Sequence, residues 1–232
     1  MEIGQSAGKS FAYVLGVFLG DGCIDNPKRY GRSGDWLRFR LNSIDADFIE
    51  AVKAALREIV PSAVWVGGPY VDRRSNRNRQ FYTLWCGHQA LCNALLDVTQ
   101  NKTVLPPMVF DWPRDCKLAL IAGLMDSEGF VAANQNRSTR RFYMGFKCCD
   151  PWVADFIRLL QSVGIRIGKV SVEEPRKPGY KAPTRFTIKM QSWITAGGHF
   201  NIARKQVRVE AWSSRRLTSE TTCQTPAPPV MI

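Results

Sequence analysis

Hydrophobic residues recur along this chain with two different periods, and these periods predict helices and strands in a repeating order. A spacing of three or four positions predicts helices, whereas strict alternation of apolar and polar residues predicts strands with one covered face. In the first half the expected helices span about 8–20, 47–60 and 88–98, and the expected strands about 22–26, 36–43, 63–71 and 80–86. In the second half the helices span about 114–127, 151–163 and 192–203, and the strands about 130–134, 141–149, 165–172 and 184–191. The chain therefore repeats an αββαββα unit, which predicts an α+β fold of two pseudo-symmetric lobes.

Three of the expected strands show the alternation most clearly. The apolar positions, which are expected to pack on helices, are Leu37, Phe39 and Leu41, then Phe142, Met144 and Phe146, then Phe186, Ile188 and Met190. The polar positions between them are mostly basic, so each half is expected to present a basic sheet face outward.

Two stretches with an acid before a glycine occupy the same place in each unit. They are VLGVFLGDG at 14–22 and IAGLMDSEG at 121–129, and Glu128 follows Asp21 by 107 positions. Between the units, Pro106, Pro107 and Pro113 prevent a continuous helix. We expect an N-terminal lobe over 1–98, a linker over 99–113, a C-terminal lobe over 114–212 and a disordered tail over 213–232, which is rich in Ser, Thr and Pro.

Each repeated stretch is an apolar helix that ends at a glycine, as many helices do. Asp21 and Glu128 are therefore expected at helix C-termini, where unpaired carbonyl oxygens and the negative end of the dipole favour a cation such as Mg²⁺. Small residues four positions apart, which share a helix face and permit close packing, are Gly16 with Gly20 and Gly123 with Ser127. Two such helices side by side would bring both acids to one phosphodiester. For either stretch alone, an ordinary core helix with a capping glycine is the alternative.

Charge narrows the class of partner. Thirty-two Lys and Arg against 20 acids give a net charge of +12, which favours nucleic acid. There is no apolar run of membrane-spanning length and no signal-peptide pattern, so we expect no membrane partner and an intracellular protein, in the cytoplasm or wherever the host genome resides.

Seven cysteines without a CxxC pair favour reduced thiols over disulfides or a zinc site. The two histidines, His88 and His199, occupy unmatched places in the two units and are interpreted as structural.

Two basic runs, 73–79 and 176–181, lie between equivalent strands and extend the predicted basic faces. A charge run alone is commonly a solvated surface, but the matching positions and the net charge favour DNA contact. The residues predicted to contact DNA are Arg38, Arg40, Asn42, Arg73, Arg74, Arg77, Arg79, Gln80, Tyr82, Arg141, Tyr143, Lys147, Arg176, Lys177, Lys181, Arg185, Thr187, Lys189 and Gln191. The tryptophans that lie within apolar patterns are assigned to the core instead: Trp65, Trp85, Trp152 and Trp193.

Lys102 and Lys205 each follow the last helix of a unit. As a pair they would stabilise charge that develops on a phosphate near the acids. The alternative is two ordinary surface lysines after helix ends.

Together these features resemble the LAGLIDADG homing endonucleases, in the single-chain form that carries two motifs, over about residues 8–210. The resemblance implies a monomer whose two antiparallel sheets form a saddle on double-stranded DNA and cut both strands with Mg²⁺, for which Ca²⁺ or Mn²⁺ substitutes. It assigns the metal-binding carboxylates to Asp21 and Glu128, main-chain oxygen ligands to Gly20 and Ser127, and basic active-site roles to Lys102 and Lys205. The first motif has Leu19 where the second has Asp126 and the family often has an acid, but that position is not a metal ligand. Glu128 replaces the more usual Asp, which is expected to alter the metal geometry of that lobe.

Two other functions stay open on the same fold, an intron RNA maturase and a DNA-binding protein that does not cleave. Retention of both acids favours cleavage over binding alone, because carboxylates that face phosphates repel DNA. A maturase could keep both acids, so intron RNA remains a second candidate partner. A basic protein on a membrane surface is disfavoured because no amphipathic anchor helix is predicted. No protein-splicing segments flank the lobes, so a free-standing or intron-encoded enzyme is expected rather than an intein.

Overall fold

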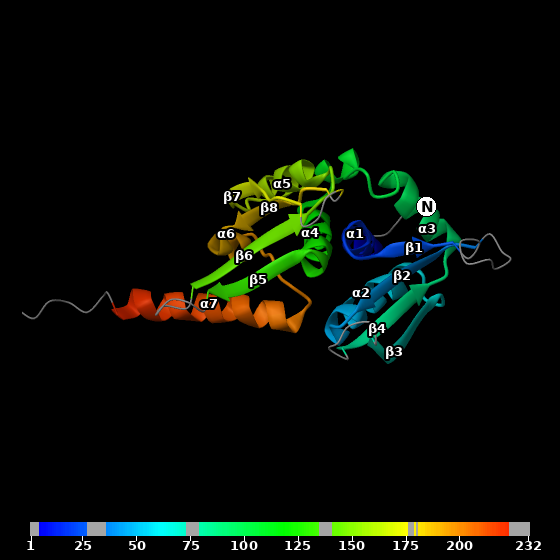
Figure 1. Cartoon of the computed structure of the whole chain (residues 1–232), viewed down its shortest axis with the longest axis horizontal. Helices are drawn as coiled ribbons and strands as arrows, with labels where there is room; N and C mark the ends of the chain where they lie inside the picture. The colour runs from blue at the N-terminus through cyan, green and yellow to red at the C-terminus, as the bar shows by residue number, and fades with distance from the viewer. Residues whose placement is uncertain are drawn as a thin grey trace, which may run out of the picture.

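The computed structural model describes residues 5–26, 36–72, 79–134, 141–175, 179 and 181–222. The first lobe contains α1 (Gln5–Leu19), β1 (Cys23–Asp25), β2 (Arg38–Ser43), α2 (Ala46–Ile59), β3 (Val64–Asp72), β4 (Arg79–Cys86) and α3 (Gln89–Val98) (Figure 1). A 3-10 helix at Pro107–Phe110 interrupts the linker. The second lobe contains α4 (Arg114–Ser127), β5 (Gly129–Asn134), β6 (Arg141–Cys148), α5 (Val153–Ser162), β7 (Ile167–Val172), β8 (Thr184–Ile188) and α6 (Met190–Thr195), followed by α7 (Ala203–Thr222). The predicted αββαββα order is confirmed in both lobes.

Each lobe has one four-stranded antiparallel sheet, and the two sheets have the same topology. The strand orders are β1-β2-β4-β3 and β5-β6-β8-β7. Alternation along the strands covers one face of each sheet: Phe39 and Leu41 of β2 are fully buried, as are Phe146 of β6 and Phe186 of β8. Helix α2 packs its apolar side on the first sheet, and α5 supplies Phe156 to an aromatic cluster on the second. The predicted α+β fold of two similar lobes is therefore present.

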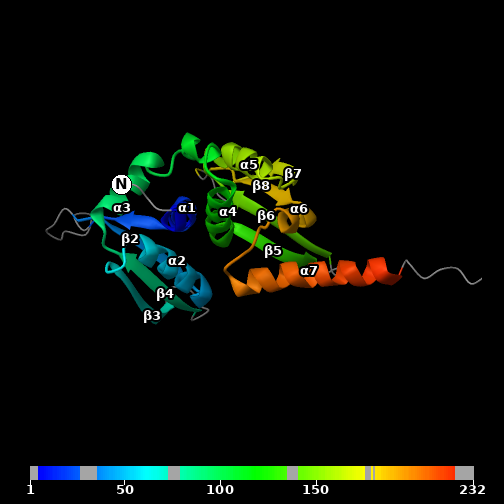
Figure 2. The same cartoon turned by 180° about the vertical axis from the view of Figure 1, so that it is seen from behind.

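Helices α1 and α4 lie side by side between the two sheets (Figures 1 and 2). Their contact is between backbones, because a Cβ atom at Gly16 would lie 2.2 Å from the Leu120 carbonyl oxygen, and one at Gly123 would lie 2.3 Å from that of Tyr13. Only glycine fits at this distance. The predicted close packing of the two motif helices through small residues is thus confirmed, and it fixes how the lobes meet.

The lobes also meet where α7 begins. The Arg204 guanidinium donates to both carboxylate oxygens of Asp45 at 2.6 and 2.7 Å, and the Ala203 amide donates to Asp47 at the start of α2. A paired guanidinium and carboxylate of this geometry fix orientation as well as distance. The arrangement of the lobes therefore depends on contacts at two separate places.

The structure corrects the predicted end of the second lobe. Strand β8 ends at Ile188. The helix expected over 192–203 is only partly present, because α6 ends at Thr195, Gly197 then takes a left-handed φ of 84°, and α7 begins only at Ala203. Residues 213–222 of the expected tail belong to α7. Val209 is buried and Arg208 donates to the Val131 carbonyl of β5, so α7 is held along the edge of the second sheet (Figure 2).

The assignment of the tryptophans to the core is confirmed only in part. Trp152 and Trp193 are buried as predicted, whereas Trp65 is 57% exposed on the outer face of the first sheet. His88 is structural as predicted, because its Nδ1 accepts a hydrogen bond from the Leu91 amide at the start of α3.

Among the described residues, no helix is both long and apolar enough to cross a membrane.

Candidate active site

The two acid-bearing helix ends are immediate neighbours. Gly20, which follows α1, lies so close to α4 that a Cβ there would be 2.4 Å from Cβ of Ser127 and 3.6 Å from Cγ of Glu128. Asp21 is the next residue along the chain, and Glu128 is the C-cap of α4, whose amide bonds to the Leu124 carbonyl at 2.9 Å. The packing of the helices therefore brings two carboxylates, one from each lobe, to a single place.

The surroundings of these carboxylates disfavour their ionised forms. Burial raises the pKa of Glu128 to about 7, and the charges of Asp21 and Asp150 act in the same direction, against Lys102 and Lys205. Burial also raises the pKa of Asp21, while the two lysines oppose the rise. Carboxylates that repel each other in a partly dehydrated place are stabilised by a bound cation. Asp150, which follows β6, is a third acid near the site.

Both predicted lysines reach the helix ends. The Lys102 ammonium donates to the carbonyl oxygens of Gly20 at 2.6 Å and Gly22 at 3.2 Å. Lys205 is only 4% exposed and donates to the carbonyls of Met125 at 2.9 Å and Asp126 at 2.6 Å. Burial lowers the pKa of both, that of Lys205 to about 8. Each ammonium thus lies at the negative end of one motif helix, beside the acids.

The donor atoms suit a hard divalent cation only in part. Among the described residues, no group of three or more His, Cys, Asp or Glu side chains could hold a metal ion, so Asp21 and Glu128 would be its two protein carboxylates. The predicted main-chain ligand at Gly20 already accepts a hydrogen bond from Lys102. A metal held here would need further oxygens from water or from a phosphate, as Mg²⁺ usually does.

Known proteins resemble this chain in fold far more than in sequence. No family model matches the sequence. An uncharacterized protein of Methanocaldococcus jannaschii is 28% identical over 133 residues, which are 57% of this chain but only 43% of that protein. The homing endonuclease I-WcaI bound to its DNA recognition sequence superposes with a TM-score of 0.57 at 14% identity, over 87% of this chain and 86% of that one. I-DmoI in complex with DNA and Mn gives 0.55 at 13% identity, over 82% and 94%. This chain has the LAGLIDADG fold.

The same fold also occurs in WhiA. Full-length WhiA from Thermotoga maritima superposes with a TM-score of 0.52 at 10% identity, over 93% of this chain and 63% of that one. The superpositions establish the LAGLIDADG fold in its single-chain, two-lobe form. Sequence identities this low leave the activity to be argued from the site.

Asp126, which precedes Glu128 by two residues, has a structural role. It is 1% exposed and accepts hydrogen bonds from the Tyr13 hydroxyl of the first lobe at 2.9 Å, and from the amide and side chain of Asn201 at 3.1 and 2.9 Å. These bonds hold the segment that leads into α7 against both motif helices. Leu19, at the matching place in the first lobe, is buried in the core.

The basic sheet faces contain acids that the sequence analysis did not single out. Asp25 of β1 lies opposite Arg38, and its carboxylate is 3.0 Å from the Arg40 guanidinium and 3.7 Å from that of Arg38. In the second lobe Glu173 pairs with Lys147 and, at 3.2 Å, with Arg185. The only sequence signal for this pairing was that Asp25 lies in the strand expected over 22–26, and the antiparallel neighbour of that strand, β2, is known only from the structure. The paired cations are held in place on the strands rather than left free to move.

The other residues predicted to contact DNA have mixed positions. Asn42, Arg79, Gln80, Tyr143 and Lys181 are exposed, and the Thr187 hydroxyl accepts from the Lys169 amide. Tyr82 packs partly against the core, because its parity along β4 matches that of Leu84. Lys189 and Gln191 belong to the start of α6 and not to β8. Six of the predicted contacts lie outside what the structure describes: Arg73, Arg74, Arg77, Arg176, Lys177 and the side chain of Arg141.

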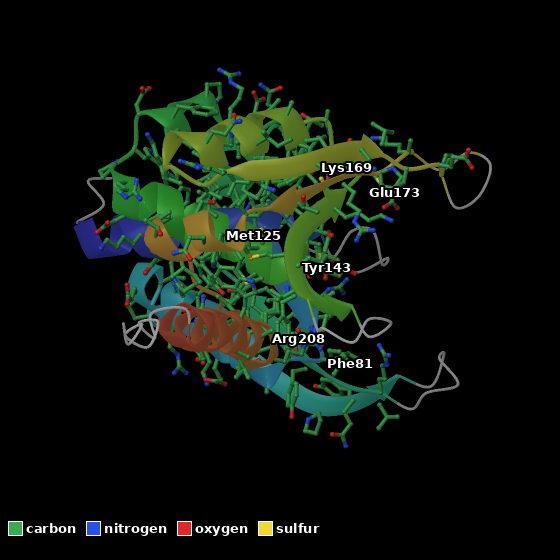
Figure 3. The ribbon with its side chains drawn as sticks, turned by 90° about the vertical axis from the view of Figure 1, so that its left-hand side faces the viewer. Phe81, Met125, Tyr143, Lys169, Glu173 and Arg208 are labelled. Carbon is green, nitrogen blue, oxygen red and sulfur yellow. The ribbon has the colours of Figure 1, made fainter. Side chains whose placement is uncertain are left out.

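Figure 3 views the molecule from the left-hand side of Figure 1, so that the strands lie toward the right of the picture and most of the helices toward the left. The labelled Tyr143 and Glu173 from the second sheet and Phe81 from the first lie toward the right, away from the helices. The outer faces of both sheets therefore open toward the same side of the molecule, and α1 and α4 lie between the two sheets.

Proposed function

We propose that this protein is a site-specific homing endonuclease that makes metal-dependent double-strand breaks in a long DNA target by phosphodiester hydrolysis. The observation that carries the proposal is the meeting of Asp21 and Glu128, one from each lobe, at adjoining helix ends with a lysine at each. One acid from each lobe suits a reaction carried out once on each DNA strand.

The chemistry is divided between two kinds of residue. Asp21 and Glu128 would hold Mg²⁺, which, when bound, polarises the phosphoryl oxygens and lowers the pKa of attacking water. Lys102 and Lys205, held at the helix ends by carbonyl oxygens, lie where they would stabilise negative charge on a phosphate. The pKa of Lys205, lowered to about 8 by burial, also favours proton transfer at this lysine near neutral pH.

Double-stranded DNA is the partner that the outer surface fits best. The net charge of +12 and the strand-borne cations Arg38, Arg40, Lys147 and Arg185 suit a polyanion. Two similar sheet faces that open in one direction suit successive stretches of one duplex. The DNA complexes of I-WcaI and I-DmoI, proteins of the same fold, support this assignment.

The test is cleavage of a randomised duplex library by the full chain, with Mg²⁺ or with EDTA, followed by sequencing of the ends. We expect recurrent double-strand breaks at one long site, only with Mg²⁺. Asp21→Asn and Glu128→Gln should each abolish double-strand cleavage of that site while duplex binding persists. Full cleavage by both variants would refute the assigned chemistry.

A DNA-binding protein that does not cleave is the second candidate. The favouring observation is that the Gly20 carbonyl, expected to bind metal, accepts from Lys102, and WhiA shares the fold. Selective retention of one duplex with no breaks under any divalent cation would establish this function. Preferential retention of a structured intron RNA over duplex DNA would establish the maturase alternative.

A further inference from the structure

Three tryptophans of the first lobe gather on the outer face of its sheet. Trp36, Trp65 and Trp85, together with Arg38 and Gly87, line an open pocket of about 460 Å³. Trp65 is 57% exposed and Trp36 is 44% exposed. Large apolar rings rarely remain this accessible without a partner, so the cluster indicates a contact surface.

The strand register explains why the rings meet. Trp65 of β3 and Arg40 of β2 both lie opposite Trp85 of β4, on the face away from the core. Glycine leaves room for the rings, since a Cβ at Gly67 would be 3.0 Å from the ring of Trp85 and one at Gly87 would be 3.3 Å from that of Trp65. The cluster is therefore set by the sheet itself and exists before any partner binds.

The cluster also belongs to the basic face. The Arg38 guanidinium lies 5.3 Å from the ring centre of Trp36, and Arg40 is directly opposite Trp85. An apolar surface flanked by cations suits a partner whose apolar groups lie beside negative charge. This combination disfavours the apolar core of another protein and favours the groove of a nucleic acid.

The second lobe lacks the cluster. The positions that match Arg40, Trp85 and Trp65 in its sheet are Lys147, Arg185 and Ser171. Lys147 and Arg185 share Glu173, so this part of the second lobe is ionic where the first lobe is aromatic. The two sheets would therefore recognise different chemistry in the two halves of one DNA site.

Base stacking in a duplex hides the faces of the bases and leaves only their edges accessible. In the major groove, thymine is distinguished by an apolar group, its C5 methyl, beside hydrogen-bonding atoms. We propose that the cluster of Trp36, Trp65 and Trp85 recognises thymine methyl groups in the half-site bound by the first lobe, an inference that rests on the proposed DNA-binding function. Arg38 and Arg40 then contact the flanking phosphates or guanine edges.

Replacement of single thymines by uracil tests this directly, because uracil lacks only the methyl group. Duplexes retained by the full chain are first selected in Ca²⁺, and each thymine of the selected site is then replaced in turn. Burial of one methyl group corresponds to about a fourfold change in Kd. We expect at least one uracil in the first lobe's half-site to weaken binding by about this factor, and uracils in the other half-site to have no effect.

The variant Trp65→Ala should bind thymine and uracil duplexes equally, and Trp36→Ala should reduce the discrimination. Ser171→Ala is the matched control, since Ser171 occupies in the second sheet the register position of Trp65, and it should discriminate as the unmodified protein does. Equal affinity of the unmodified protein for thymine and uracil would overturn methyl recognition, as would discrimination that survives in Trp65→Ala. Enhanced fluorescence of a 2-aminopurine placed in the first lobe's half-site, with no change in affinity on uracil substitution, would overturn methyl recognition in favour of a base flipped out of the duplex. Failure to select any duplex would overturn the proposed function as well.

Discussion

Glu128 is expected to destabilise the metal-free protein at alkaline pH, and Glu128→Gln should remove this effect. Its carboxyl has a pKa of about 7 in the folded protein against an ordinary value of 4.5, because burial and the charges of Asp21 and Asp150 disfavour ionisation. A carboxyl that holds its proton more tightly when folded contributes stability at low pH. This contribution is complete below about pH 4.5 and is lost as the pH rises through about 7.

The size of the effect follows from these two pKa values. The full difference corresponds to about 3 kcal/mol, of which about 2 kcal/mol should disappear between roughly pH 5.5 and pH 8.5. Contact of the side chain with solvent reduces the measured figure to about 1–2 kcal/mol. Glutamine has nearly the same shape and cannot ionise, so the variant should not lose this part of the stability.

The assay is urea unfolding in EDTA at both pH values, with the unmodified protein, Glu128→Gln and a surface control, Glu50→Gln. Glu50 is an exposed residue of α2, and its carboxylate lies 2.7 Å from the Lys53 ammonium. Only Glu128→Gln should become more stable relative to the unmodified protein as the pH rises. Adding Mg²⁺ at about pH 8.5 should then stabilise the unmodified protein more than the variant. Parallel pH profiles for all three proteins would refute the assigned electrostatics of the site.

Three further predictions concern the helix interface and its surroundings. Gly16→Ala should destabilise the protein by about 3 kcal/mol or more in urea unfolding. Gly8→Ala in the same helix should be neutral or slightly stabilising, because its Cβ would lie at an ordinary contact distance of 3.8 Å from Sγ of Cys116. Equal effects of the two substitutions would contradict the backbone contact. Asp126→Ala should cost about 2–4 kcal/mol because it removes a buried acceptor, yet the folded fraction should still cleave, the reverse of the outcome for Glu128→Gln; loss of cleavage in fully folded protein would make Asp126 part of the chemistry. Lys205→Met should lower the single-turnover cleavage rate by about a hundredfold with little change in duplex Kd, and an unchanged rate would exclude this lysine from the reaction.

Sequence alone determined the order of the elements and the pairing of the two motifs. Apolar periodicity is a local property, and it survives in the structure because each helix and strand must bury the same stripe that the pattern marks, as Phe39 and Leu41 do in β2. The duplication added a second constraint, because residues 107 positions apart in two similar units take similar places. That is why Asp21 and Glu128, and the glycines at the interface, could be located without coordinates.

Tertiary structure alone decided which groups face one another and which are covered. The pairing of Asp25 with Arg40, the engagement of the Gly20 carbonyl by Lys102 and the exposure of Trp65 depend on strand neighbours and helix packing far apart in the sequence. Tryptophan in an apolar pattern was assigned to the core, but parity along β3 turns Trp65 to the outer face beside Trp85. Likewise, the composition of 213–222 suggested disorder, whereas α7 is anchored before that segment by the burial of Val209 and by the Arg208 bond to β5, and the helix continues from this anchor. Local patterns specify what each element must bury, and long-range packing determines what remains exposed to bind a partner.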